Sequence, residues 1–140
     1  MQDDIRRITD YFKDRDEVSA IYIFGSAARG KETAESDIDI AVLIDDRKKG
    51  RKTYESLKKE YYSASPKFSL RPIDIVVLNT APPFLKHRII KTGKVLFDRN
   101  RRLRVRFVAN AIIEYLDYKP IEDICLKAVA GRFRRASVGR

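Results

Sequence analysis

The sequence contains a single cysteine, and this scarcity excludes several classes of protein. Cys125 has no partner for a disulfide within the chain, and one thiolate is too few to build a thiolate metal cluster from this chain alone. We expect Cys125 to be a small, buried core residue. No apolar run approaches the ~20 residues that cross a bilayer. Internal repeats and low-complexity segments are also missing.

The remaining composition is that of one compact globular domain. The chain has 140 residues, of which 44% are hydrophobic and 36% charged, so a sizeable core is expected. It begins with the acidic, amphipathic stretch "MQDDIRRITDYF", which is unlike a secretory signal or a transit peptide. We therefore expect a cytoplasmic protein with no membrane partner.

Positive charge is in excess and is unevenly distributed. The formal net charge is +10, and much of it lies in the last third, in "RNRRLRVR" and "GRFRRASVGR". Such an excess implies an acidic partner surface, a polyanion such as nucleic acid, or only solubility. Charge alone does not choose among them.

Hydrophobic periodicity predicts helices and strands that alternate along the chain. The expected elements are a helix ending near Asp14, strands at 19–24 and 36–44, a helix to about Ser63, a strand at 71–78, a helix at 81–93, a short strand at 94–97 and a helix with an apolar stripe from Leu103 to Leu116. The stripe either packs on the core or partly meets another protein. Pro120 is expected to start a separate last helix that ends near Gly131, followed by a frayed basic tail.

The stretch "IFGSAARGKETAESDIDIAVLI" places two carboxylates in an otherwise apolar strand. Side chains alternate along a strand, so Asp37 and Asp39 point the same way, about 7 Å apart along the chain. Two unpaired carboxylates that close repel, but a Mg²⁺ ion between them would use their oxygens and keep room for substrate phosphates. Asp74, in the next strand, has a similar place, and an adjacent strand would bring it within reach of the same ion. Three such carboxylates would form a site for two metal ions.

The turn before these acids offers groups that suit a phosphate. Gly25 lets the backbone approach a ligand closely, and Ser26 supplies a hydroxyl and an N–H. The residues that follow are expected to open a short helix whose N-terminus favours an anion. Arg29 adds a guanidinium suited to phosphate oxygens. The pattern predicts a nucleoside triphosphate held by the turn, with its α phosphate over the metals.

These residues resemble the signature of the polymerase-β-type nucleotidyltransferases. The matching positions are Gly25-Ser26, Arg29-Gly30 and Ser36-Asp37-Ile38-Asp39, with Asp74 as the third acid. The stretch "NTAPPFLKHRIIKTGKVLFDR" is similar to the minimal MNT-type antitoxins of HEPN/MNT toxin–antitoxin pairs, and "EYLDYKPIEDI" looks like their C-terminal region. The resemblance implies an α/β (α+β) fold with a small mixed sheet of about four strands flanked by helices. It implies a nucleotidyltransferase core at 1–100, C-terminal helices at 101–131 and a basic tail at 132–140.

The same resemblance implies an activity and a partner. Members of this group are proposed to transfer AMP from ATP to a tyrosine of a HEPN ribonuclease toxin, which silences the toxin, and to bind it directly. Asp37 and Asp39 would then ligate both metal ions, and Asp74 would ligate the catalytic ion and help deprotonate the attacking hydroxyl. Gly25, Ser26 and Arg29 would hold the triphosphate.

Other functions stay open at this point. One alternative is a non-catalytic antitoxin that neutralises the toxin only by blocking its surface. The three intact acids argue against this alternative. Nucleotidyl transfer to a small molecule is a second alternative, but no second domain is evident to form an acceptor pocket. An RNA-binding module, suggested by the basic tail, is the third. The nucleotide used, the number transferred and the acceptor residue are not set by the sequence.

Overall fold

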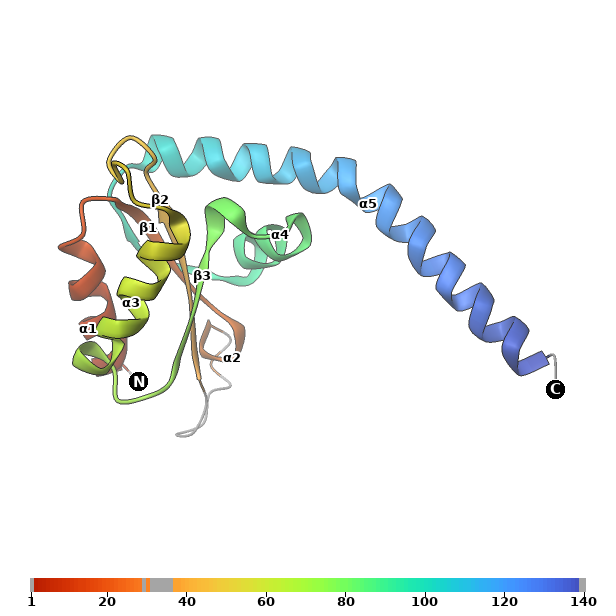
Figure 1. Cartoon of the computed structure of the whole chain (residues 1–140), viewed down its shortest axis with the longest axis horizontal. Helices are drawn as coiled ribbons and strands as arrows, with labels where there is room; N and C mark the ends of the chain where they lie inside the picture. The colour runs from red at the N-terminus through yellow and green to blue at the C-terminus, as the bar shows by residue number, and fades with distance from the viewer. Residues whose placement is uncertain (1, 29, 31–36, 139–140) are drawn as a thin grey trace.

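A small sheet with helices on both faces forms the body of the protein, and one long helix projects from it (Figure 1). The computed structural model describes residues 2–28, 30 and 37–138, with side chains as far as Arg132. The elements are α1 (Gln2–Lys13), β1 (Val18–Phe24), α2 (Gly25–Ala28), β2 (Ile38–Ile44), α3 (Tyr54–Phe68), β3 (Ile73–Val77), the 3₁₀ turn η1 (Leu78–Thr80), α4 (Pro83–Thr92), β4 (Lys94–Asp98) and α5 (Arg101–Val138).

The sheet is mixed, as the sequence predicted. Its strand order is β3-β2-β1-β4, in which β1 runs antiparallel to both β2 and β4 while β2 and β3 are parallel. Six of the seven residues of β2 are buried, and the exception is Asp39. A central strand covered on both faces is expected to be apolar almost throughout, so the single half-exposed acid is conspicuous.

Each face of the sheet supports its own apolar cluster. Alternate residues of β2 divide between them, with Ile38, Ile40, Val42 and Ile44 on the face covered by α1 and α3. Ala41 and Leu43 lie on the opposite face, with residues of α4 and the beginning of α5. Side chains two positions apart on a strand point to the same side, so Asp39 lies on the face of Ala41 and Leu43, which we call the α4 face.

Helix α3 is longer than the sequence predicted. A capping box starts it, in which the Thr53 hydroxyl accepts from the Ser56 N–H at 3.0 Å and Ser56 Oγ accepts from the Thr53 N–H at 3.1 Å. The prediction that it ends near Ser63 is wrong, because the helix continues to Phe68. The last turn is held by packing, since the Phe68 ring stacks on Tyr11 of α1 with ring centroids 4.3 Å apart.

The C-terminal region is one helix instead of the two that the sequence predicted. Helix α5 runs from Arg101 to Val138 with Pro120 inside it, so the predicted helix start at Pro120 and helix end near Gly131 are both wrong. A proline removes one helical hydrogen bond, and the affected turn is exposed, so water can serve the freed carbonyl group. Figure 1 shows α5 bending near its middle, as a helix does at an internal proline.

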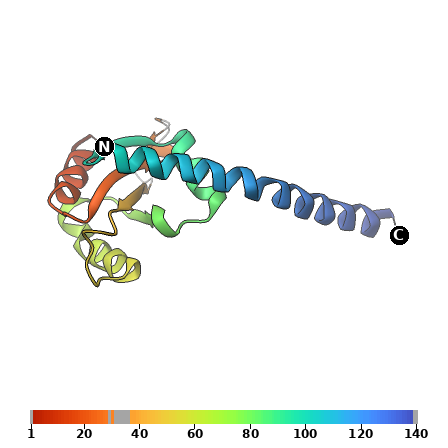
Figure 2. The ribbon, with the colours of Figure 1, turned by 90° about the horizontal axis from the view of Figure 1, so that it is seen from above.

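Only the first part of α5 packs on the domain. Leu103 and Phe107 contact the α4-face cluster, and Ala111 is buried. Beyond Ala111 the described side chains are mostly exposed, and the helix extends well past the sheet in both views (Figures 1 and 2). The prediction that Cys125 is buried is wrong, because this residue lies exposed on the projecting half. Within the described residues, no helix combines the length and apolar character needed to span a bilayer.

Candidate active site

Two of the three predicted acids are direct neighbours in the sheet. In the parallel pairing of β2 with β3, Asp39 is opposite Asp74, and the flanking pairs Ile38 with Ile73 and Ile40 with Ile75 fix this register. Paired residues on adjacent strands point to the same face, about 5 Å apart at the backbone. The sheet therefore holds both carboxylates side by side on the α4 face.

The glycine turn lies directly against the first of these acids. Gly25 follows β1, whose last residue Phe24 pairs with Asp39, and it begins α2 with a φ of +71°. A Cβ at this position would lie 2.2 Å from Asp39 Oδ2. Glycine is thus required at position 25 for two reasons: the backbone has a positive φ, and the carboxylate of Asp39 occupies the space of a Cβ. Ser26, in the same turn, is partly exposed.

The electrostatics at Asp39 are those of an uncompensated acidic cluster. Burial, followed by repulsion from Asp74 and Asp37, raises the pKa of the Asp39 carboxyl above its ordinary value, while the positive charge of Arg88 on α4 partly opposes the rise. A carboxylate in such surroundings is stabilised by any cation that approaches it.

The remaining predicted residues are less closely gathered. Asp37 immediately precedes β2 and is exposed. Arg29 lies outside the described residues, as does Ser36 of the motif. Among the described side chains, no three His, Cys, Asp or Glu groups stand close enough together to hold a metal ion as they are placed. The structure therefore pairs Asp39 with Asp74 and places Asp37 nearby, and the roles of all the predicted site residues stay predictions.

Tyr62 forms a hydrogen bond with Asp74 at the edge of the sheet. Its hydroxyl, on α3, donates to Asp74 Oδ1 at 3.0 Å and accepts from the Ile75 N–H at 2.8 Å. Strand β3 is at an edge of the sheet, so the phenol satisfies a backbone group that no neighbouring strand reaches. The second oxygen of Asp74 makes no hydrogen bond with any described residue.

Replacing Tyr62 with phenylalanine is expected to lower the free energy of unfolding by about 1–2 kcal/mol, because the N–H of the buried Ile75 loses its acceptor. Chemical denaturation measures this change. Tyr118→Phe is the matched control, since its hydroxyl makes no hydrogen bond with a described residue. Equal stability of the two variants would show that the Tyr62 hydroxyl does not hold β3.

Sequence patterns could not assign Tyr62 and Arg88 to this site. Tyr62 adjoins Tyr61, which is fully buried, so apolar packing accounts for both tyrosines equally well. Arg88 lies on α4 within a basic stretch, and only the packing of α4 over the sheet brings its charge near Asp39. Each residue is more than ten positions from its acid, beyond the range of local spacing rules.

Several known proteins are similar to this chain in sequence or in fold. Protein adenylyltransferase MntA of Aphanizomenon flos-aquae is 27% identical over 123 residues, which span 84% of this chain and 82% of that protein. A chain of the crystal structure of the toxin–antitoxin MntA–HepT superposes with a TM-score of 0.73 at 22% identity, covering 93% of this chain and 99% of that chain. A chain of the complex between tri-AMPylated Shewanella oneidensis HEPN toxin and MNT antitoxin gives a TM-score of 0.72 at 22% identity, covering 92% and 98%.

A third similar structure was determined with a nucleotide analogue. A chain of a toxin–antitoxin crystal structure with AMP-PNP gives a TM-score of 0.67 at 24% identity, over 90% of this chain and 98% of that chain. At these identities the superpositions establish the fold, and they confirm the fold predicted from the sequence. The family described as "Polymerase beta, Nucleotidyltransferase" matches residues 6–102, which include every predicted site residue. The chain therefore belongs to the polymerase-β nucleotidyltransferase family.

Proposed function

We propose that this protein is an antitoxin that transfers AMP from ATP to a tyrosine of a partner HEPN-type toxin and thereby neutralises it. One observation carries the catalytic part of the proposal. Asp39 and Asp74 are held opposite each other on parallel strands, and Asp39 lies against a glycine turn in which a Cβ on Gly25 would collide with its carboxylate. The named relatives, a protein adenylyltransferase and complexes of HEPN toxin with its antitoxin, support the choice of acceptor and partner.

The acidic pair suits Mg²⁺ in its chemistry. Carboxylate oxygens are the protein ligands that this ion prefers, and it keeps coordination positions for phosphate oxygens. The raised pKa of Asp39, caused by burial and then by its acidic neighbours, means that a cation would relieve an existing repulsion. Asp37, Asp39 and Asp74 would hold the metal, with two ions expected. A bound ion would neutralise charge on the phosphates and on the attacking and leaving oxygens.

The residues of the chain then have separate tasks. Asp74, fixed through one oxygen by the Tyr62 hydroxyl, is proposed to accept the proton of the attacking tyrosine with its other oxygen. Gly25 and Ser26 are proposed to contact the triphosphate with their backbone N–H groups, and the Ser26 hydroxyl adds a further donor. Positioning of the α phosphate against the acceptor is the main contribution expected of the protein in such a reaction.

Direct binding of the toxin is assigned to the projecting half of α5. Ile121 and Ile124 are exposed by 61% and 67%, and Ile113 and Leu116, on the same side of the helix, are also exposed. A helix that packs on nothing is marginally stable in water, and contiguous exposed apolar side chains mark protein interfaces. This surface favours a protein acceptor over a small-molecule acceptor, because a small substrate would need no such docking helix.

Ile121→Asp combined with Ile124→Asp is expected to weaken the complex with the co-expressed toxin at least about 100-fold, since buried apolar anchors contribute about 2 kcal/mol or more each. Affinity is measured by titration after the partners are separated. The matched control is Lys119→Asp, which changes charge on the far side of the helix from Ile121. If the control weakens binding as much as the double variant, the apolar face is not the docking surface.

Mass spectrometry of the complex tests the proposed reaction. With ATP and Mg²⁺, the toxin is expected to gain whole multiples of the adenylate mass on a tyrosine, and without either one it is expected to gain none. An intact complex in which the toxin never gains mass would show a non-catalytic antitoxin. Transfer to a small hydroxyl compound in the absence of any toxin, without transfer to the toxin, would show the small-molecule enzyme instead.

A further inference from the structure

A second polar cavity lies at the opposite end of β2 from the acidic pair. Its volume is about 430 Å³, and it is lined by Arg47, Asn100, Arg102, Leu103 and Arg106. Asp39 and Ile44 are five positions apart along β2, or roughly 17 Å at the rise of a strand. This cavity is therefore separate from the candidate active site.

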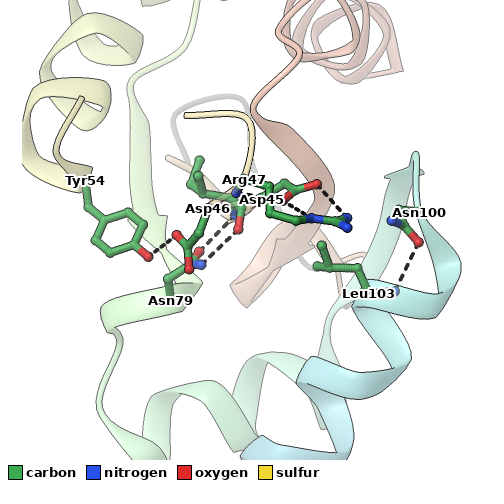
Figure 3. Close-up of polar contacts among 8 residues, drawn as sticks. Asp45, Asp46, Arg47, Tyr54, Asn79, Asn100 and Leu103 are labelled. Atoms are coloured by element: carbon green, nitrogen blue, oxygen red, sulfur yellow. Dashed lines mark hydrogen bonds and ion pairs between the residues drawn. The ribbon is translucent and has the colours of Figure 1, made fainter. Parts of the chain in front are cut away.

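The cavity is built where the loop after β2 meets the start of α5. Figure 3 shows Arg47 extending from that loop toward Leu103 of α5. Asn100 caps the helix, and its side chain oxygen accepts from the Leu103 N–H at 3.1 Å. A loop and a helix that are far apart in the sequence thus contribute three arginines to one cavity.

The loop that carries Arg47 is firmly held. The Asn79 amide makes two hydrogen bonds of 2.9 Å with the N–H and C=O of Ile44, at the end of β2 (Figure 3). Asp45, which is 97% buried, accepts from the Arg47 backbone N–H at 3.0 Å and from its guanidinium at 3.3 Å. The first arginine is therefore positioned by a buried framework before any ligand arrives.

Two of the three positive charges that line the cavity have no acidic partner among the described residues. Arg102 and Arg106 make no hydrogen bond or ion pair with any described residue, whereas Arg47 has Asp45. The first turn of α5 also contains no acidic residue, although the N-terminus of a helix favours negative charge. The three guanidinium groups are exposed, so an anion can reach all of them from solvent. Guanidinium groups pair best with the paired oxygens of phosphate.

A smaller cavity adjoins the first and shares Arg47, Leu103 and Arg106 with it. Its volume is about 280 Å³, and its lining also includes Asn79, Phe107 and Asn110 and two acids, Asp45 and Asp46. Asp45 is paired with Arg47, and Asp46 accepts from the Tyr54 hydroxyl, so the phosphates are expected on the arginine side. An apolar ring and amides beside a cationic cavity suit the organic part of a ligand whose phosphates lie among the arginines.

We propose that Arg47, Arg102 and Arg106 form a second ligand site, which binds a small phosphorylated molecule with at least two phosphate groups. The compact cavity favours such a molecule over a nucleic acid strand, which would need charge spread along a surface. The proposal is independent of the nucleotidyl-transfer function, because none of its residues belongs to the acidic site.

Isothermal titration with inorganic pyrophosphate in EDTA tests the proposal on the full-length chain. Without a divalent cation the acidic site repels phosphates, so binding under these conditions reports on the arginine cavity. Wild-type protein is expected to bind pyrophosphate. Arg102→Ala and Arg106→Ala are each expected to weaken binding about tenfold or more, as for a lost hydrogen bond between charged groups.

Arg101→Ala is the matched control, since it removes the same charge from the same turn of α5 but from outside the cavity. It is expected to change affinity less than threefold. Thermal melts of all three variants show whether they fold. Three results would overturn the proposal: no pyrophosphate binding by the wild type, an equal loss in Arg101→Ala, or arginine-dependent binding of an RNA oligonucleotide with none of pyrophosphate.

Discussion

Asp39→Asn is expected to reduce AMP transfer at least about 10³-fold, while the complex with the toxin stays intact. Asparagine keeps the shape of the side chain but removes the charge that attracts the metal ions, and a catalytic ion contributes several kcal/mol to the transition state. The measurement is single-turnover transfer to the toxin, followed by mass. Asp10→Asn, an exposed acid on α1, is the matched control and is expected to react at the wild-type rate.

The same substitution is expected to raise the melting temperature in the absence of divalent ions. Burial and the neighbouring acids raise the pKa of Asp39 in the folded state, so the unfolded chain loses this proton at a lower pH than the folded chain. In that interval the folded state binds more protons, and stability falls as the pH rises. The charged carboxylate thus destabilises the fold at neutral pH, and asparagine removes this effect.

Two comparisons check the origin of the stability change. The difference in melting temperature between Asp39→Asn and wild type is expected to vanish below the ordinary carboxyl pKa, where both side chains are neutral. Added Mg²⁺ is expected to raise the melting temperature of the wild type more than that of the variant, because ligands stabilise the state that binds them. A variant that is less stable than wild type at neutral pH, or that transfers AMP normally, would refute the assignment of Asp39.

Gly25→Ala is expected to reduce AMP transfer at least about 100-fold. The added methyl group would lie 2.2 Å from Asp39 Oδ2, so the carboxylate must move away from its position beside Asp74. Moving a catalytic group by about 1 Å from the reacting atoms is enough to cause a loss of this size. The φ of +71° adds roughly 1 kcal/mol of backbone strain for an L side chain.

Gly50→Ala separates the two effects. Gly50 has a similar φ of +65°, but a Cβ there would meet nothing within 4 Å. Its alanine variant is expected to lose roughly 1 kcal/mol of stability and no activity. Denaturation and transfer assays on both variants provide the comparison. If Gly25→Ala loses only the stability that Gly50→Ala loses and still transfers AMP, the close approach to Asp39 has no role in catalysis.

The sheet could be predicted because its strands are short apolar runs that the turn residues interrupt clearly. The acids could be singled out for the same reason, since Asp39 is the single charged residue within β2 and Asp74 the single one within β3. Their pairing is a matter of register between strands that are 35 residues apart, which spacing along one chain does not encode. The pairing of Asp39 with Asp74 is therefore known only from the folded structure.

The differences between the predicted and the observed helices have a common cause in packing and solvent. Helix α3 continues past its predicted end because Phe68 packs on α1, and no local signal reports a contact so far away in the chain. Helix α5 continues through Pro120 because that turn is exposed, so the freed carbonyl is hydrated. The arginine cavity combines a loop and a helix that are about fifty residues apart, and net charge alone gave no hint of its position.

The parallel pairing of β2 with β3 also sets when the protein acquires its chemistry during folding. A slip of one residue between these strands would turn one of the two carboxylates to the opposite face of the sheet, so partly registered intermediates have no acidic pair. Parallel strands joined by a helical crossover are among the later contacts to form. A folding chain is therefore expected to be inactive until β3 has paired with β2. The appearance of AMP transfer during refolding would then report the last stage of folding.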